Sequence, residues 1–290
     1  MAQVRWSIIG VGVAGRARAR AINEDPQAEL VAVWRGRFAE AVGAPVLGSL
    51  DDAIAAADAV AICSPTPLHR AQVEAALRAG RHVVVEFPMA QGPAEARALF
   101  DLADRLDLVL HVEHIELLEP AGRTLCGQVR PEVIDAVRVR FERAGTADAG
   151  PPALALGNVA RIHRLCALAG PVAAVRSVVS APGRLEAELQ MDAGFIATLV
   201  FEQAPYLRRH TTVEVDTPTD RWRQVDGSLA RNGKDVSLLG VRSLFGRDHA
   251  YAMGAITEGS PSYVDRTRIL HVLEVVQRLG AERVGPLSTP

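Results

Sequence analysis

The sequence has almost no lysine. Lys234 is the only lysine among 32 basic residues, so arginine carries nearly all of the positive charge. A proton relay based on lysine therefore has one possible source. Cysteine is also scarce, and the three cysteines Cys63, Cys126 and Cys166 are isolated and odd in number. We expect neither a disulfide framework nor a zinc site, and no metal site of another kind is predicted.

Long apolar runs and a strong net charge are missing as well. No run approaches the roughly 20 apolar residues that span a bilayer, so we expect no membrane association. The formal net charge of −2 does not indicate a nucleic-acid partner. The N-terminal residues lead directly into a predicted strand, so we expect no secretion signal and a cytoplasmic location. A length of 290 residues, 49% of them hydrophobic, suits two domains.

A glycine-rich turn follows the first predicted strand, residues 4–9. The turn has the G-x-G-x-x-G pattern and a predicted helix, residues 16–23, comes after it. In this context the pattern is typical of a dinucleotide-binding turn, whose backbone approaches a pyrophosphate at a helix N-terminus. The alternative is a glycine turn without a ligand. The predicted cofactor contacts here are Gly10, Gly12, Val13, Ala14 and Gly15.

The end of the second predicted strand, residues 29–34, informs the choice of cofactor. An acidic residue at this point would bind the ribose 2′-hydroxyl of NAD. The chain instead reads Trp34-Arg35-Gly36-Arg37, so two guanidinium groups are available for a 2′-phosphate. This pattern favours NADP(H) over NAD(H), with Trp34 or Arg35 also able to stack on adenine. The alternative is that the arginines form a solvated loop.

Two apolar runs, residues 59–63 and 82–86, read as buried parallel strands around a predicted helix, residues 68–79. Ser64-Pro65-Thr66-Pro67 follows the first run, at the strand end where ligands bind in open α/β sheets. The motifs Ser-Pro-Thr-Pro-x-His, Ala-Gly-Arg-His-Val and Glu-x-Pro resemble those of the Gfo/Idh/MocA oxidoreductases. The resemblance implies cofactor contacts from Ser64, Pro65, Thr66, His69, Glu86 and Phe87. For His69 the alternative is an ordinary residue at a helix start.

Phe87 departs from the family pattern. The family normally carries lysine inside Glu-Lys-Pro, and a phenylalanine cannot take the proton of a hydroxyl group during alcohol oxidation. Within the family, biliverdin reductases carry an aromatic residue here, mostly tyrosine. The run from 110 to 118 also resembles theirs, and Glu113 and Glu116 fall on glutamates that lie near nicotinamide and substrate in those enzymes. His114, between them, is a further candidate for substrate binding.

The two glutamates have both a functional and a structural interpretation. If both are helical, their spacing places them on one face. They could equally be a capping cluster for a predicted helix over residues 116–128.

The second half of the chain changes character. Alternating apolar and polar residues over 134–143, 173–179, 184–191, 195–202 and 211–215 predict a largely antiparallel open sheet. Helices are predicted over 159–169 and 263–279. We therefore expect an α/β protein with an NADP-binding Rossmann domain, residues 1–118, and a substrate-binding α+β domain, residues 119–290.

Arginines are the candidate substrate-binding groups of this second domain. Sugar-oxidising family members place a catalytic histidine nine residues before the glycine that ends the helix. This chain has Arg161 there, as biliverdin reductases do, and a fixed cation suits a carboxylate-bearing or electron-accepting substrate. Arg208 and Arg209 could bind propionate groups or form a solvated turn.

The resemblance implies NADPH-dependent reduction of biliverdin or a related linear tetrapyrrole, by hydride transfer to the central methine carbon. Arg161, Glu113, Glu116 and Phe87 would form the catalytic group, in a monomer or homodimer. Two alternatives remain: a reductase of another conjugated or imine substrate, and a non-catalytic NADP-binding regulator.

Overall fold

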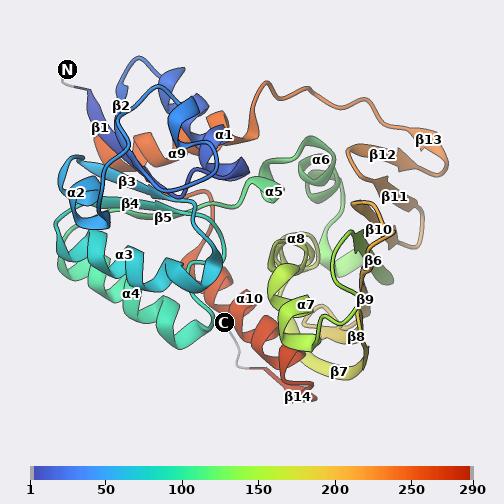
Figure 1. The fold of residues 1–290 in the computed structure, drawn as a ribbon. Coiled ribbons are helices and arrows are strands. Elements are labelled where there is room, and N and C mark those ends of the chain that lie inside the picture. Colours follow the sequence, from blue (N-terminus) through green and yellow to red (C-terminus); the bar gives the residue numbers. More distant parts are fainter. Residues whose placement is uncertain (1–2, 288–290) are drawn as a thin grey trace. The chain divides into compact units, whose positions relative to one another are not determined.

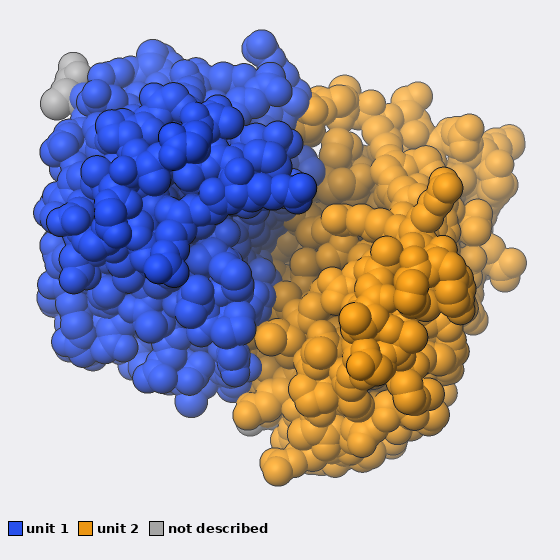
Figure 2. All heavy atoms as spheres, in the orientation of Figure 1, with its two compact units in different colours: residues 1–115, 242–264 blue, residues 116–241, 265–290 orange. Residues whose placement is uncertain are grey.

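The computed structural model describes residues 3–287 and divides into two compact units (Figures 1 and 2). Unit 1 contains the residues up to Ile115 together with Arg242–Val264. Unit 2 contains Glu116–Val241 together with the residues from Asp265 onwards. The expected fold class is confirmed: a Rossmann-like parallel sheet comes first, and a mostly antiparallel sheet follows.

Unit 1 is built on a five-stranded parallel sheet in the order β2-β1-β3-β4-β5. Its strands are short runs of Val, Ile and Ala, and β3 is buried over its whole length because helices cover both faces. The strands are β1 (Val4–Ile9), β2 (Ala28–Trp34), β3 (Ala59–Ile62), β4 (His82–Val85) and β5 (Leu110–Val112).

Helices of unit 1 lie between these strands, and one returns from much later in the chain. The helices are α1 (Val13–Asn23), α2 (Leu50–Ala55), α3 (His69–Arg78), α4 (Pro93–Arg105) and α9 (Leu244–Glu258). Helix α9 contributes Ala252 and Met253 to the same apolar cluster as Trp6 and Ile22. Ser243 caps its first turn by accepting a hydrogen bond from the amide of Gly246.

Helix α9 lies in unit 1, although the domain boundary expected at residue 118 would place it in the second domain. That division assigned one continuous segment to each domain, whereas unit 1 takes Arg242–Val264 back from the second half of the chain. Neither α9 nor this return was predicted. The reason is that only contacts distant in sequence hold α9 to unit 1, such as its packing against α1.

Unit 2 is built on a nine-stranded sheet in the order β13-β12-β11-β10-β6-β9-β8-β7-β14. All neighbours are antiparallel except β6 and β9. The strands are β6 (Ala136–Arg143), β7 (Val172–Ala181), β8 (Arg184–Met191), β9 (Ile196–Gln203), β10 (His210–Asp216), β11 (Arg221–Val225), β12 (Ser228–Arg231), β13 (Lys234–Asp235) and β14 (Gly285–Pro286). The predicted alternation holds, since buried and more exposed residues alternate along β6, β8 and β10.

Helices α7 (Pro151–Gly157), α8 (Val159–Ala169) and α10 (Arg266–Gly280) pack together against this sheet (Figure 1). The predicted helix over 116–128 is two helices, α5 (Ile115–Leu118) and α6 (Pro120–Gln128). The helix is interrupted at Glu119, whose backbone is extended. The Glu119 carboxylate caps α6 by accepting hydrogen bonds from the amides of Ala121 and Gly122. None of the helices in residues 3–287 has both the length and the apolar character that crossing a membrane requires.

Candidate active site

The glycine-rich turn joins β1 to α1 at the carboxyl end of the parallel sheet. Gly10 has a φ of +91°, and a Cβ on it would lie 2.7 Å from backbone atoms of Ser64. A Cβ on Gly15 would lie 2.3 Å from the carbonyl oxygen of Gly10. These two glycines are therefore required for packing of the turn itself.

Gly12 has a different requirement. A Cβ on Gly12 would meet no atom of residues 3–287 within 4 Å. Gly12 is also the N-cap of α1, whose first turn has no acidic residue and no side-chain cap. The first amides of α1 therefore remain open to an anion, and the space beside Gly12 suits the close approach of a pyrophosphate. The turn fits a dinucleotide.

The loop after β2 presents arginines beside aromatic rings. The Arg35 guanidinium lies 4.7 Å from the ring centroid of Trp34, and that of Arg37 lies 5.6 Å from that of Phe38. Arg35 and Arg37 are both exposed, and neither forms an ion pair with a carboxylate of residues 3–287. Two unneutralised cations are thus available at the end of β2.

The loop after β3 is held in place by His69. Its Nδ1 lies 2.8 Å from the carbonyl oxygen of Pro88, and its Nε2 lies 2.6 Å from that of Ser64. The Ser64 hydroxyl also donates to Gln72. Both ring nitrogens of His69 are engaged by backbone, so His69 joins the Ser64 loop, with Pro65 and Thr66, to the turn that contains Phe87.

A buried ion cluster lies behind this turn. Arg18 is fully buried; its Nη1 lies 2.6 Å from Oδ2 of Asp248 and its Nη2 lies 3.5 Å from Oε1 of Glu86. Burial lowers the pKa of Arg18, but the two carboxylates outweigh it and raise that pKa overall. Asp248 also accepts from Nε2 of His111 at 2.9 Å and from the hydroxyl of Tyr263 at 2.7 Å. Burial opposes the charge of Asp248, yet Arg18 and His111 hold its pKa well below the usual range.

Glu113 directly follows β5, as Glu86 follows the neighbouring β4. Its side chain is buried, and Oε1 accepts a hydrogen bond of 2.8 Å from the amide of Ile115. Burial, and then the nearby carboxylates of Glu86 and Asp248, raise the pKa of Glu113 well above its ordinary value. Burial also raises the pKa of Glu86. Two buried carboxyl groups, Glu113 and Asp248, and the partly buried Glu86 thus lie near one arginine, which disfavours the charged form of Glu113.

His114 joins the two candidate turns. Its ring meets that of Phe87 edge to face, with centroids 4.5 Å apart, and its backbone amide donates to the Tyr263 hydroxyl at 2.8 Å. The structure therefore brings Glu86, Phe87, Glu113 and His114 together in unit 1. The helical interpretation of Glu113 and Glu116 is corrected, because Glu113 precedes α5 and only Glu116 lies within it.

Unit 2 contains the other candidates, and Arg161 and Arg209 both pair with Glu116. Oε1 of Glu116 lies 2.9 Å from Nη2 of Arg161 and 2.9 Å from Nη2 of Arg209. The Arg161 guanidinium also lies 4.0 Å from the ring centroid of Phe141. Burial lowers the pKa of Arg161 to about 10, against the opposing effect of Glu116, so Arg161 stays charged at neutral pH. Arg209 and Arg208 are exposed on the loop between β9 and β10.

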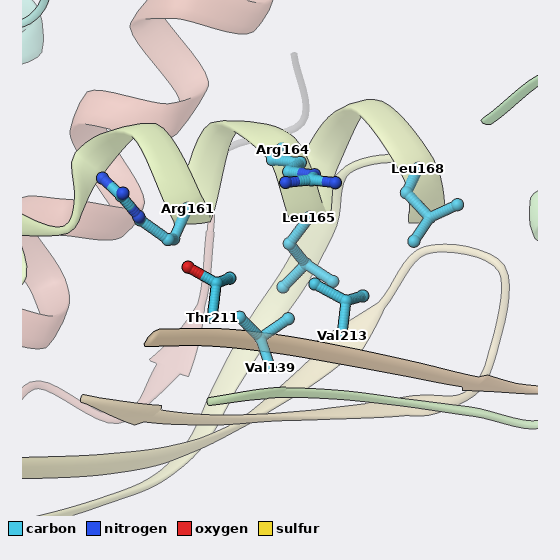
Figure 3. Close-up of a pocket in the computed structure, with 7 residues that line it drawn as sticks. All are labelled: Val139, Arg161, Arg164, Leu165, Leu168, Thr211 and Val213. Atoms are coloured by element: carbon cyan, nitrogen blue, oxygen red, sulfur yellow. The ribbon is translucent and has the colours of Figure 1, made fainter. Parts of the chain in front are cut away.

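A small pocket lies between α8 and the sheet (Figure 3). Arg161 and Arg164 come from one side of α8, above Thr211 of β10. Its remaining lining is apolar: Val139, Leu165, Leu168 and Val213. The pocket has room for about one water molecule, so by itself it does not define a site for an organic ligand.

Arg164 was not predicted from the sequence. Its Nη2 lies 3.0 Å from Oε2 of Glu119, and it also donates to Gln224. The signal that could have revealed it is its spacing of three residues from Arg161, which places the two on one helix face. Arg18, Asp248 and Tyr263 were missed as well, and no local motif marks them. Among residues 3–287 there is no group of three or more His, Cys, Asp or Glu residues placed to hold a metal ion.

Comparisons with known proteins connect this geometry to a family. Residues 4–114 match the model of the Gfo/Idh/MocA oxidoreductase family, which has an NAD-binding Rossmann fold. Biliverdin reductase A of Mus musculus is 26% identical over 94% of this chain and 94% of its own length. UDP-N-acetylglucosamine 3-dehydrogenase of Acidithiobacillus ferrooxidans is 34% identical over 48% of this chain and 46% of its own.

Among solved structures, biliverdin reductase from Synechocystis in complex with biliverdin and NADP+ superposes with a TM-score of 0.82 at 27% identity, covering 96% of this chain and 98% of that one. Together, the glycine turn, the first sheet and the family match show that residues 4–114 have the NAD-binding Rossmann fold of the Gfo/Idh/MocA oxidoreductases, and over nearly its whole length the chain is similar to biliverdin reductases.

Proposed function

We propose that the protein reduces biliverdin or a related linear tetrapyrrole with NADPH. The observation that carries the proposal is Phe87, which places an apolar ring where the family's alcohol dehydrogenases need a proton acceptor. The only lysine of the sequence, Lys234, lies on the exposed strand β13 of unit 2. The Glu-x-Pro turn itself therefore carries no lysine that could accept this proton. A substrate that accepts hydride, and has no hydroxyl to deprotonate, suits this site.

NADPH is favoured over NADH because the loop after β2 carries Arg35 and Arg37 and no carboxylate. Each guanidinium can donate two hydrogen bonds to a 2′-phosphate. Gly12 and the open first turn of α1 would hold the pyrophosphate. When bound, the reduced nicotinamide supplies the hydride that goes to the central methine carbon of the substrate.

The protein's own groups would supply charge and a proton. Arg161 is buried against Phe141 and stays charged, so it can stabilise negative charge that develops on the tetrapyrrole. Burial raises the pKa of Glu113, and its protonated form can donate a hydrogen bond or a proton toward a pyrrole nitrogen. Glu116, with Arg208 and Arg209, would orient the substrate, the two arginines by pairing with its propionate groups.

Mixing the protein with biliverdin and NADPH tests this proposal. We expect the biliverdin absorption band to be replaced by that of bilirubin, with NADPH consumed in equal amount. Spectral binding without turnover would favour a non-catalytic NADP-binding regulator, and no spectral change would favour a reductase of another conjugated or imine substrate.

A second candidate, oxidation of a nucleotide sugar, draws on the similarity to UDP-N-acetylglucosamine 3-dehydrogenase. That similarity covers about half of each chain. Phe87 argues against the candidate, since a sugar hydroxyl would keep its proton. Reduction of NADP+ or NAD+ in the presence of UDP-N-acetylglucosamine would establish this activity instead.

A further inference from the structure

A third arginine, from a different element, lies beside the arginine loop of unit 1. Arg16 is in the first turn of α1, one residue after Gly15. Its guanidinium lies over the ring of Phe38, 4.4 Å from the centroid, and the guanidinium of Arg37 lies over the same ring. Two cations from separate elements thus converge on one aromatic side chain.

The loop that carries Phe38 is fixed to the glycine turn. The amide of Phe38 donates to the carbonyl of Val11 at 3.0 Å, and the amide of Val11 donates to the carbonyl of Arg35 at 2.8 Å. Gly36 permits this approach, because its φ is +132° and a Cβ on it would lie 2.3 Å from the Val11 amide nitrogen. The arginines are therefore held at a set distance from the turn that fits the pyrophosphate.

The electrostatic balance of this cluster is incomplete. Arg16 and Arg37 are exposed, and neither pairs with a carboxylate within residues 3–287. Phe38 packs against the core of unit 1, which anchors the ring on which both cations rest. Two neighbouring cations repel each other, and a dianion received between them would relieve that repulsion.

We propose that Arg16 and Arg37, held on Phe38, form the subsite for the 2′-phosphate of NADP(H), which makes Arg16 a specificity-determining residue. This inference rests on the proposed preference for NADPH. It adds a residue outside the strand-end position where such a residue is ordinarily sought. The phosphate would receive guanidinium donors from α1 and from the loop after β2.

Binding measurements without substrate test the inference. Dissociation constants for NADPH, NADH and 2′,5′-ADP would be measured for the wild type, Arg16→Ala, Arg16→Lys and a control, Arg20→Ala. Arg20 is exposed on the same helix but pairs with Glu24, so its loss removes a cation away from Phe38. We expect Arg16→Ala to weaken NADPH and 2′,5′-ADP by about 10-fold or more, with NADH changed less than about twofold. Arg16→Lys should recover part of the loss, and Arg20→Ala should change none of the three.

Two outcomes would overturn the inference. Equal weakening of NADPH and NADH by Arg16→Ala would assign Arg16 to the pyrophosphate or to the fold, and no weakening would make it a solvated surface arginine. A wild type that binds NADH as tightly as NADPH would remove the proposed cofactor preference and the inference with it. Because no tetrapyrrole takes part, absence of biliverdin reduction would leave the inference standing.

Discussion

Phe87 and His114 lie edge to face, with ring centroids 4.5 Å apart. The contact joins the turn after β4 to the end of β5, so the side chain at position 87 positions its neighbours although it can carry no proton. We therefore expect Phe87→Tyr to fold normally and to keep kcat for biliverdin reduction within about tenfold, or about 1.4 kcal/mol of barrier.

The control for this change is Phe87→Leu, which loses the ring contact. An aromatic contact of this kind contributes about 0.5–1.5 kcal/mol, so the leucine variant should be the less stable of the two in urea unfolding. A tyrosine variant with kcat raised far more than tenfold would show that the missing hydroxyl limits the reaction, contrary to our proposal.

The largest catalytic effect is expected at Arg161. Arg161→Ala should lower kcat by about 10²-fold or more, by analogy with the loss of one preorganised donor. Both kcat and kcat/KM should fall together if the contact forms in the transition state, whereas a loss of uniform binding would raise KM alone. NADPH affinity should stay the same, because the proposed cofactor residues are all in unit 1.

The matched control for Arg161→Ala is Arg140→Ala, which removes an exposed cation of unit 2. Near-normal kcat in the Arg161 variant would contradict the prediction and shift the role to Arg164, Arg208 or Arg209.

The cofactor preference is tested by removing both arginines that the sequence places after β2. The double variant Arg35→Ala/Arg37→Ala should bind NADPH more weakly and NADH nearly as well as the wild type, because only NADPH carries the 2′-phosphate. Equilibrium titration with each cofactor measures this. Equal losses for both cofactors would contradict the assignment of these residues to the 2′-phosphate.

Glu113 gives a prediction about pH. Its folded-state pKa is raised, so its contribution to stability is present below the unfolded value of about 4.3 and is lost as pH rises toward the folded pKa. Glu113→Gln keeps an acceptor for the Ile115 amide and removes the titration. Relative to the variant, the wild type should lose up to about 1.4 kcal/mol of unfolding free energy per pH unit between about pH 4.3 and the folded-state pKa of Glu113, above which the loss stops. Parallel stability curves for the two proteins between pH 5 and pH 8 would count against a raised pKa.

Asp248 should be the most sensitive position of the buried ion cluster. Asp248→Asn leaves the guanidinium of Arg18 buried without its closest carboxylate, which should lower the free energy of unfolding by about 3–5 kcal/mol. Urea unfolding measures the loss. The exposed pair of Arg20 and Glu24 offers the comparison, and Glu24→Gln should change stability little. An Asp248 variant as stable as the wild type would mean that Arg18 is neutralised by Glu86 alone.

Local patterns predicted the parts of the fold that local chemistry determines. The glycine turn, the strands β1 to β4 and helix α8 follow from apolar runs, periodicity and turn residues, and their predicted bounds agree with the structure to within about three residues. Helix α7 and the strands β11, β12 and β13 were not predicted. The three strands are short, and successive pairing of β11 with β10, of β12 with β11 and of β13 with β12 determines them more than alternation does.

The candidate site divides in the same way. Residues within or next to a motif, such as Glu86 and Glu113, could be selected from the sequence because the family resemblance points to them. Asp248 could not, since its partners Arg18 and His111 lie 230 and 137 residues away and nothing in its own neighbourhood marks it. The role of a buried charged residue such as Asp248 depends on its partners, and only the folded structure brings those partners together.

The return of α9 to unit 1 has a consequence for the order in which the protein can be made. During synthesis the five parallel strands leave the ribosome early, but the carboxylate that neutralises Arg18 comes 230 residues after it. Until Asp248 emerges, Glu86 is the one carboxylate among the described residues of the segment already made that pairs with this guanidinium. The first unit therefore cannot reach its final form while the chain is short, and a fragment ending at residue 118 should be a poor substitute for it.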